Sequence, residues 1–469
     1  MASPKQPLLR LKGHELVPPE EDRRVELAVY EALLPCRRYE IAYKVAVLGQ
    51  VSPTLEFLLR LIKSIPGIAE DDAAIFFGYS RSEMMYVLEE ALGPGYIERK
   101  NGRLWITTAG DSLFRDGEKV PTIFSVEERQ RSIGFDFLSI APQQPESLDL
   151  LELALPELPI EDAAPTGKIA EKIPDRFRRF FLELIERRDR EQIQRRDLYS
   201  IDRVVAGDRF QIPVRIRAYA QASNPTTAEI DLTSWRPDHE IADRPQIESS
   251  AALFLEDMKT SRNQMAAHVA YEKLVEFAPE FLKEFTTKTG LAVNRYWREA
   301  VGRAGEPRVD RKTIPIVGSP CLQENMGRLL AVLDYGLRDK PELPGFILSV
   351  APQTRNWAAT TLQREALSVI RQKIAQTSTN ADQPDIKTIC LFAGKPPRYV
   401  ERAFDEVRSL VVAELPPALE ILLIGRAAVV AVVHSPIGAS TGYPAPLGFA
   451  SFDGAVLDRV WAALKPHIA

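Results

Sequence analysis

The spacing of hydrophobic residues in the first eighty positions is typical of helices. Apolar side chains over residues 25–34 fit one face of an amphipathic helix, and those over 42–65 fit a second helical stretch. Ser52 precedes a proline there, which favours a helix start at that point. A shorter helix is predicted over 70–77, because Gly78 follows it and glycine commonly ends helices.

The next segment has the pattern of a helix followed by a β-hairpin. A helix is predicted over 80–91, and a Gly-Pro-Gly stop at 93–95 ends it. Residues 96–107 then alternate between apolar and polar positions around Asn101 and Gly102. An Asn-Gly pair between alternating strands is the strongest short-range signal of a hairpin, so its tip is predicted at these two residues.

The rest of the chain changes from mixed elements to a regular alternation of strands and helices. Two strands are predicted over 210–232 and a long helical region over 250–285. From about Pro341 onwards strands alternate with helices, which indicates an α/β layer. The strands of this layer are predicted at 345–350, 386–392, 419–425 and 428–433, and its helices at 360–374 and 397–415.

Charge marks the connections between these regions. Residues 142–175 are acidic and rich in proline, which is typical of a linker or docking strap. Residues 176–196 carry many arginines beside an apolar stripe, as in a salt-bridged solvated helix or a helix that docks on the acidic segment or on nucleic acid.

The predicted fold class is therefore a multidomain α+β protein. Its expected parts are an N-terminal tail and helix (1–45), a domain of helices and a hairpin (46–141), the acidic Pro-rich linker (142–175), the basic helix with a middle α+β domain (176–340) and a C-terminal α/β domain (341–469).

Composition narrows the classes of function. A chain of 469 residues with 45% hydrophobic and 27% charged residues can build several packed cores. Its net charge of −5 excludes a protein that is basic throughout, so any nucleic-acid contact must be a local patch. Cys36, Cys321 and Cys390 are far apart, so no disulfide framework, metal site or cofactor is expected. We find no signal peptide or membrane-length apolar run, and we expect a cytoplasmic protein without a membrane partner.

The helices and hairpin before residue 114 resemble the winged helix-turn-helix family. Residues 70–78 match its second helix, 80–91 its recognition helix and 96–107 its wing. In that family the recognition helix enters the major groove of double-stranded DNA. The resemblance implies DNA contacts from Arg81, Ser82, Arg99, Lys100, Asn101 and Arg103. A winged helix that docks a protein is the alternative, because the recognition helix offers a single basic side chain near its start.

A second resemblance lies near the C-terminus. An apolar strand over 428–433 delivers His434, and a turn from Gly448 to Asp453 follows. This segment resembles the active site of the phospholipase D superfamily, in which a histidine attacks phosphorus while a lysine and an asparagine hold the phosphate oxygens. Three supporting positions depart from that pattern: Pro436 replaces the lysine, Thr441 the aspartate and Ser451 the asparagine. The resemblance therefore implies a degenerate half-domain with His434 as the catalytic candidate of an inactive site; an unrelated α/β domain is the alternative.

The expected function is a non-catalytic, DNA-binding scaffold component of a nucleic-acid-associated protein assembly. The combination of a winged helix with a degenerate phospholipase D-like domain resembles architectures of prokaryotic antiviral defence or mobile-element systems. One alternative is a phosphodiesterase or nuclease completed by a homodimer or a partner, in which Lys395 or Arg426 would point at His434. Another is a transcription regulator whose C-terminal domain binds an effector in an apolar pocket.

Overall fold

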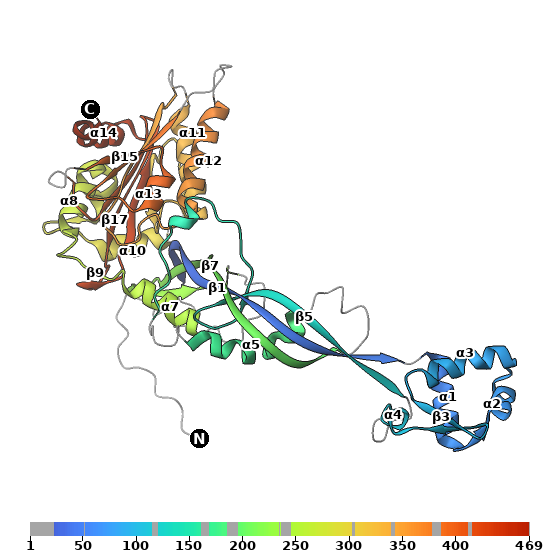
Figure 1. Ribbon diagram of the computed structural model, residues 1–469. Coiled ribbons are helices and arrows are strands. Elements are labelled where there is room, and N and C mark those ends of the chain that lie inside the picture. Colours follow the sequence, from blue (N-terminus) through green and yellow to red (C-terminus); the bar gives the residue numbers. More distant parts are fainter. Residues whose placement is uncertain are drawn as a thin grey trace, which may run out of the picture. The chain divides into compact units, whose positions relative to one another are not determined.

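The computed structural model is a mixed α+β protein with several separate sheets (Figure 1). It describes residues 23–50, 52–114, 121–160, 168–184, 196–233, 235, 245–302, 305–338, 343–377, 386–410 and 415–468. The chain forms two compact units: unit 1 comprises residues 1–36, 136–163 and 209–469, and unit 2 comprises residues 37–135 and 164–208. Each unit is thus assembled from segments that are distant in sequence.

Residues 53–111 of unit 2 form helices packed on a small three-stranded sheet. The helices are α1 (Pro53–Ser64), α2 (Glu70–Phe77), α3 (Arg81–Leu92) and the one-turn α4 (Thr108–Asp111). The sheet has the order β2–β4–β3, with β2 (Ile68–Ala69), β3 (Ile97–Lys100) and β4 (Arg103–Ile106). Leu58, Leu88 and Leu104 are among its buried core residues. The predicted helices and hairpin of this segment are confirmed.

Short polar signals fix the ends of these elements. Ser52 accepts a hydrogen bond from the backbone N–H of Leu55 at 3.1 Å, and Ser80 forms a reciprocal capping box with Glu83. Such caps satisfy backbone donors that a helix start leaves unpaired. Asn101 and Gly102 have φ values of 53° and 73°. A type I′ turn requires positive φ at both positions, which explains why Asn-Gly stands at the hairpin tip.

Long strands replace the helix predicted over 25–34. β1 (Arg24–Gln50) is one continuous strand, so that prediction and the helical interpretation of 42–50 are wrong. The five-stranded sheet that contains β1 has the order β6–β5–β1–β7–β8. Its other strands are β5 (Thr122–Asp136), β6 (Pro142–Gln143), β7 (Arg196–Gln221) and β8 (Asn224–Asp231). A short apolar run is compatible with a helix or a buried strand, and here pairing with distant strands decides the outcome.

Helix α5 (Ile169–Leu184) packs on β1 within unit 2. Phe177 and Phe181 lie against Tyr43, with ring centroids 5.0 and 5.9 Å apart. The apolar stripe predicted for the basic segment is therefore confirmed over this helix. Residues 185–195 of the predicted basic helix lie outside the described residues.

Unit 1 is built around a seven-stranded mixed sheet with the order β12–β19–β17–β16–β13–β14–β15. Its strands are β12 (Thr313–Val317), β13 (Phe346–Val350), β14 (Lys387–Phe392), β15 (Glu406–Ser409), β16 (Leu419–Ile424), β17 (Ala428–Ser435) and β19 (Ala445–Ser451). β13, β14 and β15 are parallel, whereas the remaining neighbours pair antiparallel. All four predicted strands of the α/β layer are present, but β12 shows that this sheet begins before Pro341.

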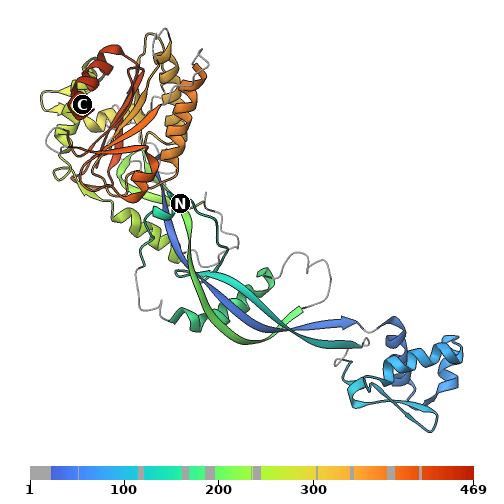
Figure 2. The ribbon, with the colours of Figure 1, turned by 45° about the horizontal axis from the view of Figure 1, so that its top comes forward.

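Helices cover both faces of this sheet (Figures 1 and 2). α11 (Gln323–Leu337) and α12 (Leu362–Thr377) contribute to the core that contains Leu422 and Val430. α8 (Ala267–Phe277), α10 (Val293–Gly302) and α14 (Gly454–Ile468) lie on the other face. There the Tyr296 hydroxyl donates a hydrogen bond to the Gly448 carbonyl at 2.5 Å.

Two helices predicted in unit 1 are replaced by shorter elements. The region predicted as helical over 250–285 consists of α7 (Pro245–Glu256), α8 and the short α9 (Pro279–Leu282), because Pro279 starts a new helix. The helix predicted over 397–415 ends at Ala403, as α13 (Arg398–Ala403), and β15 follows it.

The acidic segment is part of unit 1 over residues 142–160, whereas residues 169–175 begin helix α5 of unit 2. Leu151 and Leu155 are buried in the same core as Leu33, and the backbone N–H of Leu33 donates to the Pro156 carbonyl at 2.8 Å. Because these residues are packed into the core, this part of the segment is a docked strap and not an open linker.

Glycine at position 336 allows α11 to approach the turn between β16 and β17. A Cβ atom on Gly336 would lie 1.9 Å from the carbonyl oxygen of Ala427. We expect Gly336→Ala to lower the free energy of unfolding by about 1–3 kcal/mol in urea titrations, as overpacking generally does. Gly327→Ala on the same helix is the control, since no atom lies within 4 Å of its added Cβ. Equal stabilities of the two variants would contradict this close approach.

Candidate functional site

The predicted wing residues lie together at the exposed tip of the β3–β4 hairpin. Each cation has a partner: Arg99 pairs with Glu70, Lys100 pairs with Glu98, and Arg103 donates to the Gly67 carbonyl at 2.8 Å. The Lys100 side chain is 64% exposed. Exposed ion pairs contribute only about 0–1 kcal/mol, so a phosphate group can take the place of these carboxylates.

The first residues of α3 are a poorer site for DNA phosphates than the resemblance to a recognition helix implies. Arg81 and Ser82 are exposed, but the Ser82 hydroxyl lies 3.1 Å from the Ser80 hydroxyl within the capping turn. Glu83 accepts hydrogen bonds from the backbone and hydroxyl of Ser80, and these bonds lower the pKa of its carboxyl. A negative charge therefore lies at the same helix start as the two candidate donors, which is unfavourable for phosphate.

His434 is a buried residue with a buried carboxylate partner. Its Nε2 lies 2.5 Å from Oε2 of Glu420, and both side chains are less than a tenth exposed. Glu420 is the second residue of β16 and His434 lies near the end of β17, so the antiparallel hairpin brings them together. The pair is enclosed by the sheet and is a buried polar contact rather than an accessible nucleophile.

Ser451 of the phospholipase D-like pattern is not brought to His434. Ser451 pairs with Val429, five positions from His434 along β17, or about 17 Å at a strand's rise of about 3.4 Å per residue. Arg426 lies in the turn at the far end of the same hairpin, where it pairs with Asp458 at 2.6 Å. The predicted condition for an active site, a cation directed at His434, is therefore not met by Arg426.

More polar groups lie near this pair in the interior of unit 1. The hydroxyls of Tyr30 and Tyr443 are 2.7 Å apart, and Cys321 Sγ lies 2.8 Å from Oε1 of Gln363. Burial raises the pKa of Tyr30 to about 12 and also raises the pKa of the Cys321 thiol. These groups stay neutral at physiological pH, so the cysteine is not a reactive thiolate.

Glu31 connects three segments of unit 1. Its carboxylate accepts hydrogen bonds from the Arg215 guanidinium at 2.7 and 2.9 Å and from the Thr361 backbone N–H at 2.6 Å. The residue is 4% exposed. Asn356 and Ala358, in the loop before Thr361, both have positive φ. Asparagine tolerates positive φ but alanine is strained there, so Glu31 helps to hold an unfavourable conformation at Ala358 in place.

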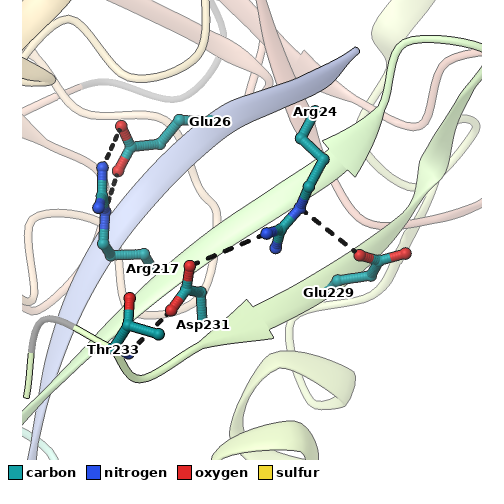
Figure 3. Close-up of polar contacts among 6 residues, drawn as sticks. All are labelled: Arg24, Glu26, Arg217, Glu229, Asp231 and Thr233. Carbon is teal, nitrogen blue, oxygen red and sulfur yellow. Dashed lines mark hydrogen bonds and ion pairs between the residues drawn. The ribbon is translucent and has the colours of Figure 1, made fainter. Parts of the chain in front are cut away.

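A ladder of charged side chains joins β1, β7 and β8 within unit 1 (Figure 3). Arg217 forms a two-point contact with Glu26 at 2.7 and 3.0 Å, and this hydrogen bonding raises the pKa of the Arg217 guanidinium. Arg24 lies 3.9 Å from Glu229 and 4.0 Å from Asp231. The charges satisfy one another across neighbouring strands, so the ladder stabilises strand pairing and offers no unpaired group to a substrate.

A small polar pocket adjoins the first residues of β1. Its wall is formed by the residues Arg23, Arg24, Val25, Glu26, Ala300, Val301, Val317, Leu322, Glu324, Asn325 and Arg328. Two of its cations have partners inside the protein, since Arg23 donates to the Val301 carbonyl and Arg328 pairs with Glu324. It is not the apolar effector pocket that a regulator would require.

Metal and membrane sites receive no support from the described residues. In that part of the chain no group of three or more His, Cys, Asp or Glu side chains is arranged to hold a metal ion. Every helix of the same residues is too short or too polar to cross a bilayer.

Comparison with known proteins gives no relative. Family models, curated proteins and solved structures all fail to match this chain.

Sequence reasoning missed Glu420 and Glu31. Glu420 is the only charged residue in the predicted strand 419–425. A lone carboxylate in an apolar strand needs a partner, so this pattern could have predicted a buried polar contact of Glu420. Glu31 gave no comparable signal, because its segment was assigned to a helix and its partners are far away in sequence.

Proposed function

We propose that this chain is a non-catalytic component of a nucleic-acid-associated protein assembly, with residues 53–111 forming a winged helix. The order helix, strand, helix, helix, hairpin supports the winged helix. The observation that carries the DNA contact is the hairpin tip, where Arg99, Lys100 and Arg103 surround an exposed two-residue turn. Three cations on one small projection form a local basic patch on a chain whose net charge is −5.

The proposed DNA contact is made to phosphates rather than to base edges. Met85, Tyr86, Glu89 and Glu90 are exposed on α3, and carboxylates there disfavour entry into the major groove. Binding through the wing is therefore weak, independent of sequence and sensitive to salt.

Unit 1 has the role of a scaffold in this proposal. His434 is buried against Glu420, and Arg426 and Ser451 lie at the other end of β17, which supports a non-catalytic role. For the phosphodiesterase alternative, Arg426 does not supply the required cation, because it lies at the other end of the β16–β17 hairpin from His434. The pocket beside the first residues of β1 is polar, so it does not support the regulator alternative.

The wing is tested by the salt dependence of DNA binding. Fluorescence anisotropy with labelled double-stranded DNA is expected to show binding that weakens with added salt. Replacing Arg99 and Lys100 with alanine is expected to lower the slope of log K against log salt by about 0.9 for each lost phosphate contact. Arg60→Ala on α1, which removes an ordinary surface ion pair with Glu56, serves as the control. Binding that is unaffected by the wing variant, or absent at low salt, contradicts the proposed contact.

A further inference from the structure

The outward faces of α2 and α3 carry large apolar side chains that the core does not use. Ile75 and Phe76 on α2 and Met85 and Tyr86 on α3 are 57–77% exposed. The core of this module is filled by other residues of the same helices, including Ala73, Met84 and Leu88. Single exposed apolar residues are ordinary, but adjacent pairs on two consecutive helices indicate a surface that is covered in a complex.

Each apolar pair lies one helical turn from a pair of carboxylates. Asp71 and Asp72 precede Ile75 and Phe76 by four residues, and Glu89 and Glu90 follow Met85 and Tyr86 by four. Residues four apart lie on the same side of a helix. All four carboxylate residues are exposed, and within the described chain none of them forms an ion pair. The two faces therefore combine apolar contact area with unneutralised negative charge.

We propose that these outward faces of α2 and α3, defined by the four apolar and four acidic residues, dock a segment of a partner protein in which lysine or arginine residues flank apolar anchors. Charge complementarity selects this occupant. The apolar anchors cover the four exposed side chains, while the basic residues neutralise the carboxylates and direct the encounter. The proposal adds a protein-binding surface to the wing and does not depend on the wing binding DNA.

Two other occupants fit these faces poorly. DNA brings phosphates to a surface with four exposed carboxylates and, one turn before Met85, the single cation Arg81, so the net interaction is repulsive. A second copy of this chain in a two-fold symmetric contact brings the same acidic face against itself, because both subunits use the same patch. A basic, apolar protein segment satisfies both the apolar area and the charge.

The test is a selection from a displayed library of random peptides on the full chain. The selected peptides are expected to combine basic residues with aromatic or aliphatic anchors. Labelled copies are expected to bind the wild-type chain at least about tenfold more tightly than a chain with Ile75→Ser, Phe76→Ser, Met85→Ser and Tyr86→Ser. A chain with Asp71→Asn, Asp72→Asn, Glu89→Gln and Glu90→Gln is expected to bind more weakly and with a smaller salt dependence.

Matched variants keep the test specific. Phe57 and Ile65, also exposed in this module, belong to or adjoin α1, so their change to serine should leave peptide binding unaltered. The Arg99→Ala, Lys100→Ala chain should also keep it, which separates this surface from the proposed DNA contact. The proposal is overturned if the selected peptides bind the serine variant as well as the wild type, or if they lack basic residues. It is also overturned if sedimentation shows a wild-type dimer that the serine variant abolishes.

Discussion

The variant His434→Leu is expected to lose about 3–5 kcal/mol of unfolding free energy, because it leaves the Glu420 carboxylate buried without its partner. Glu420→Leu should cost less, about 1–3 kcal/mol, since the remaining imidazole loses only a hydrogen-bond partner. The double change to leucine should recover much of the loss, because apolar residues of similar size replace both members of the pair.

A double-mutant cycle measures this coupling. Urea unfolding can be followed by tryptophan fluorescence, to which unit 1 contributes Trp235, Trp297, Trp357 and Trp461. Glu406→Ala is a suitable control, because Glu406 forms an exposed pair with Arg408 in the same sheet and should change stability by about 0–1 kcal/mol. If His434→Leu were as mild as this control, the buried pair would not be structural.

The parts of the fold that sequence predicted correctly are those fixed by local chemistry. Ser52, the Ser80–Glu83 capping box and the Asn101-Gly102 turn each specify a backbone conformation within a few residues. The helices and hairpin over 53–111 therefore follow from sequence alone. The predicted strands of unit 1 were also correct, because strongly apolar runs such as 428–433 are bounded by clear breaks.

The errors occur where distant residues decide the structure. The long strand β1 has the composition of a helix over 25–34, and its strand state depends on pairing within the sheet β6–β5–β1–β7–β8. No local signal shows that segments from the start, middle and end of the chain build unit 1 together. Domain boundaries drawn along the sequence could not represent this interleaving.

In the candidate site, too, the features fixed by local sequence were predictable and those that depend on distant residues were not. The clustering of Arg99, Lys100 and Arg103 was predictable because a hairpin tip is a local structure. The partners of these cations were not, since Arg99 meets Glu70 from α2 and Arg103 meets the Gly67 carbonyl. Likewise the strand position of His434 was correct, but its burial against Glu420 depends on the register between β16 and β17.

The variant Glu31→Ala is expected to cost about 3–5 kcal/mol, comparable with His434→Leu. It removes the acceptor of the Thr361 backbone N–H and leaves Arg215 without its carboxylate. The loop before Thr361 contains Asn356 and Ala358 at positive φ, so it should relax when this anchor is lost. Because Trp357 lies in that loop and stacks on Phe404 at 6.2 Å, its fluorescence should change in the folded state before global unfolding.

Urea titration and hydrogen exchange of residues 356–361 together test this anchor. Glu31→Gln keeps the shape and one acceptor, so it should retain part of the stability, whereas Glu229→Ala removes only a long, exposed contact with Arg24 and should cost about 0–1 kcal/mol. Faster exchange confined to the loop in Glu31→Ala supports the anchor. Unchanged exchange there, together with a stability loss no greater than that of Glu229→Ala, means that the loop is held by its own packing, with Trp357 on Phe404 as the main contact.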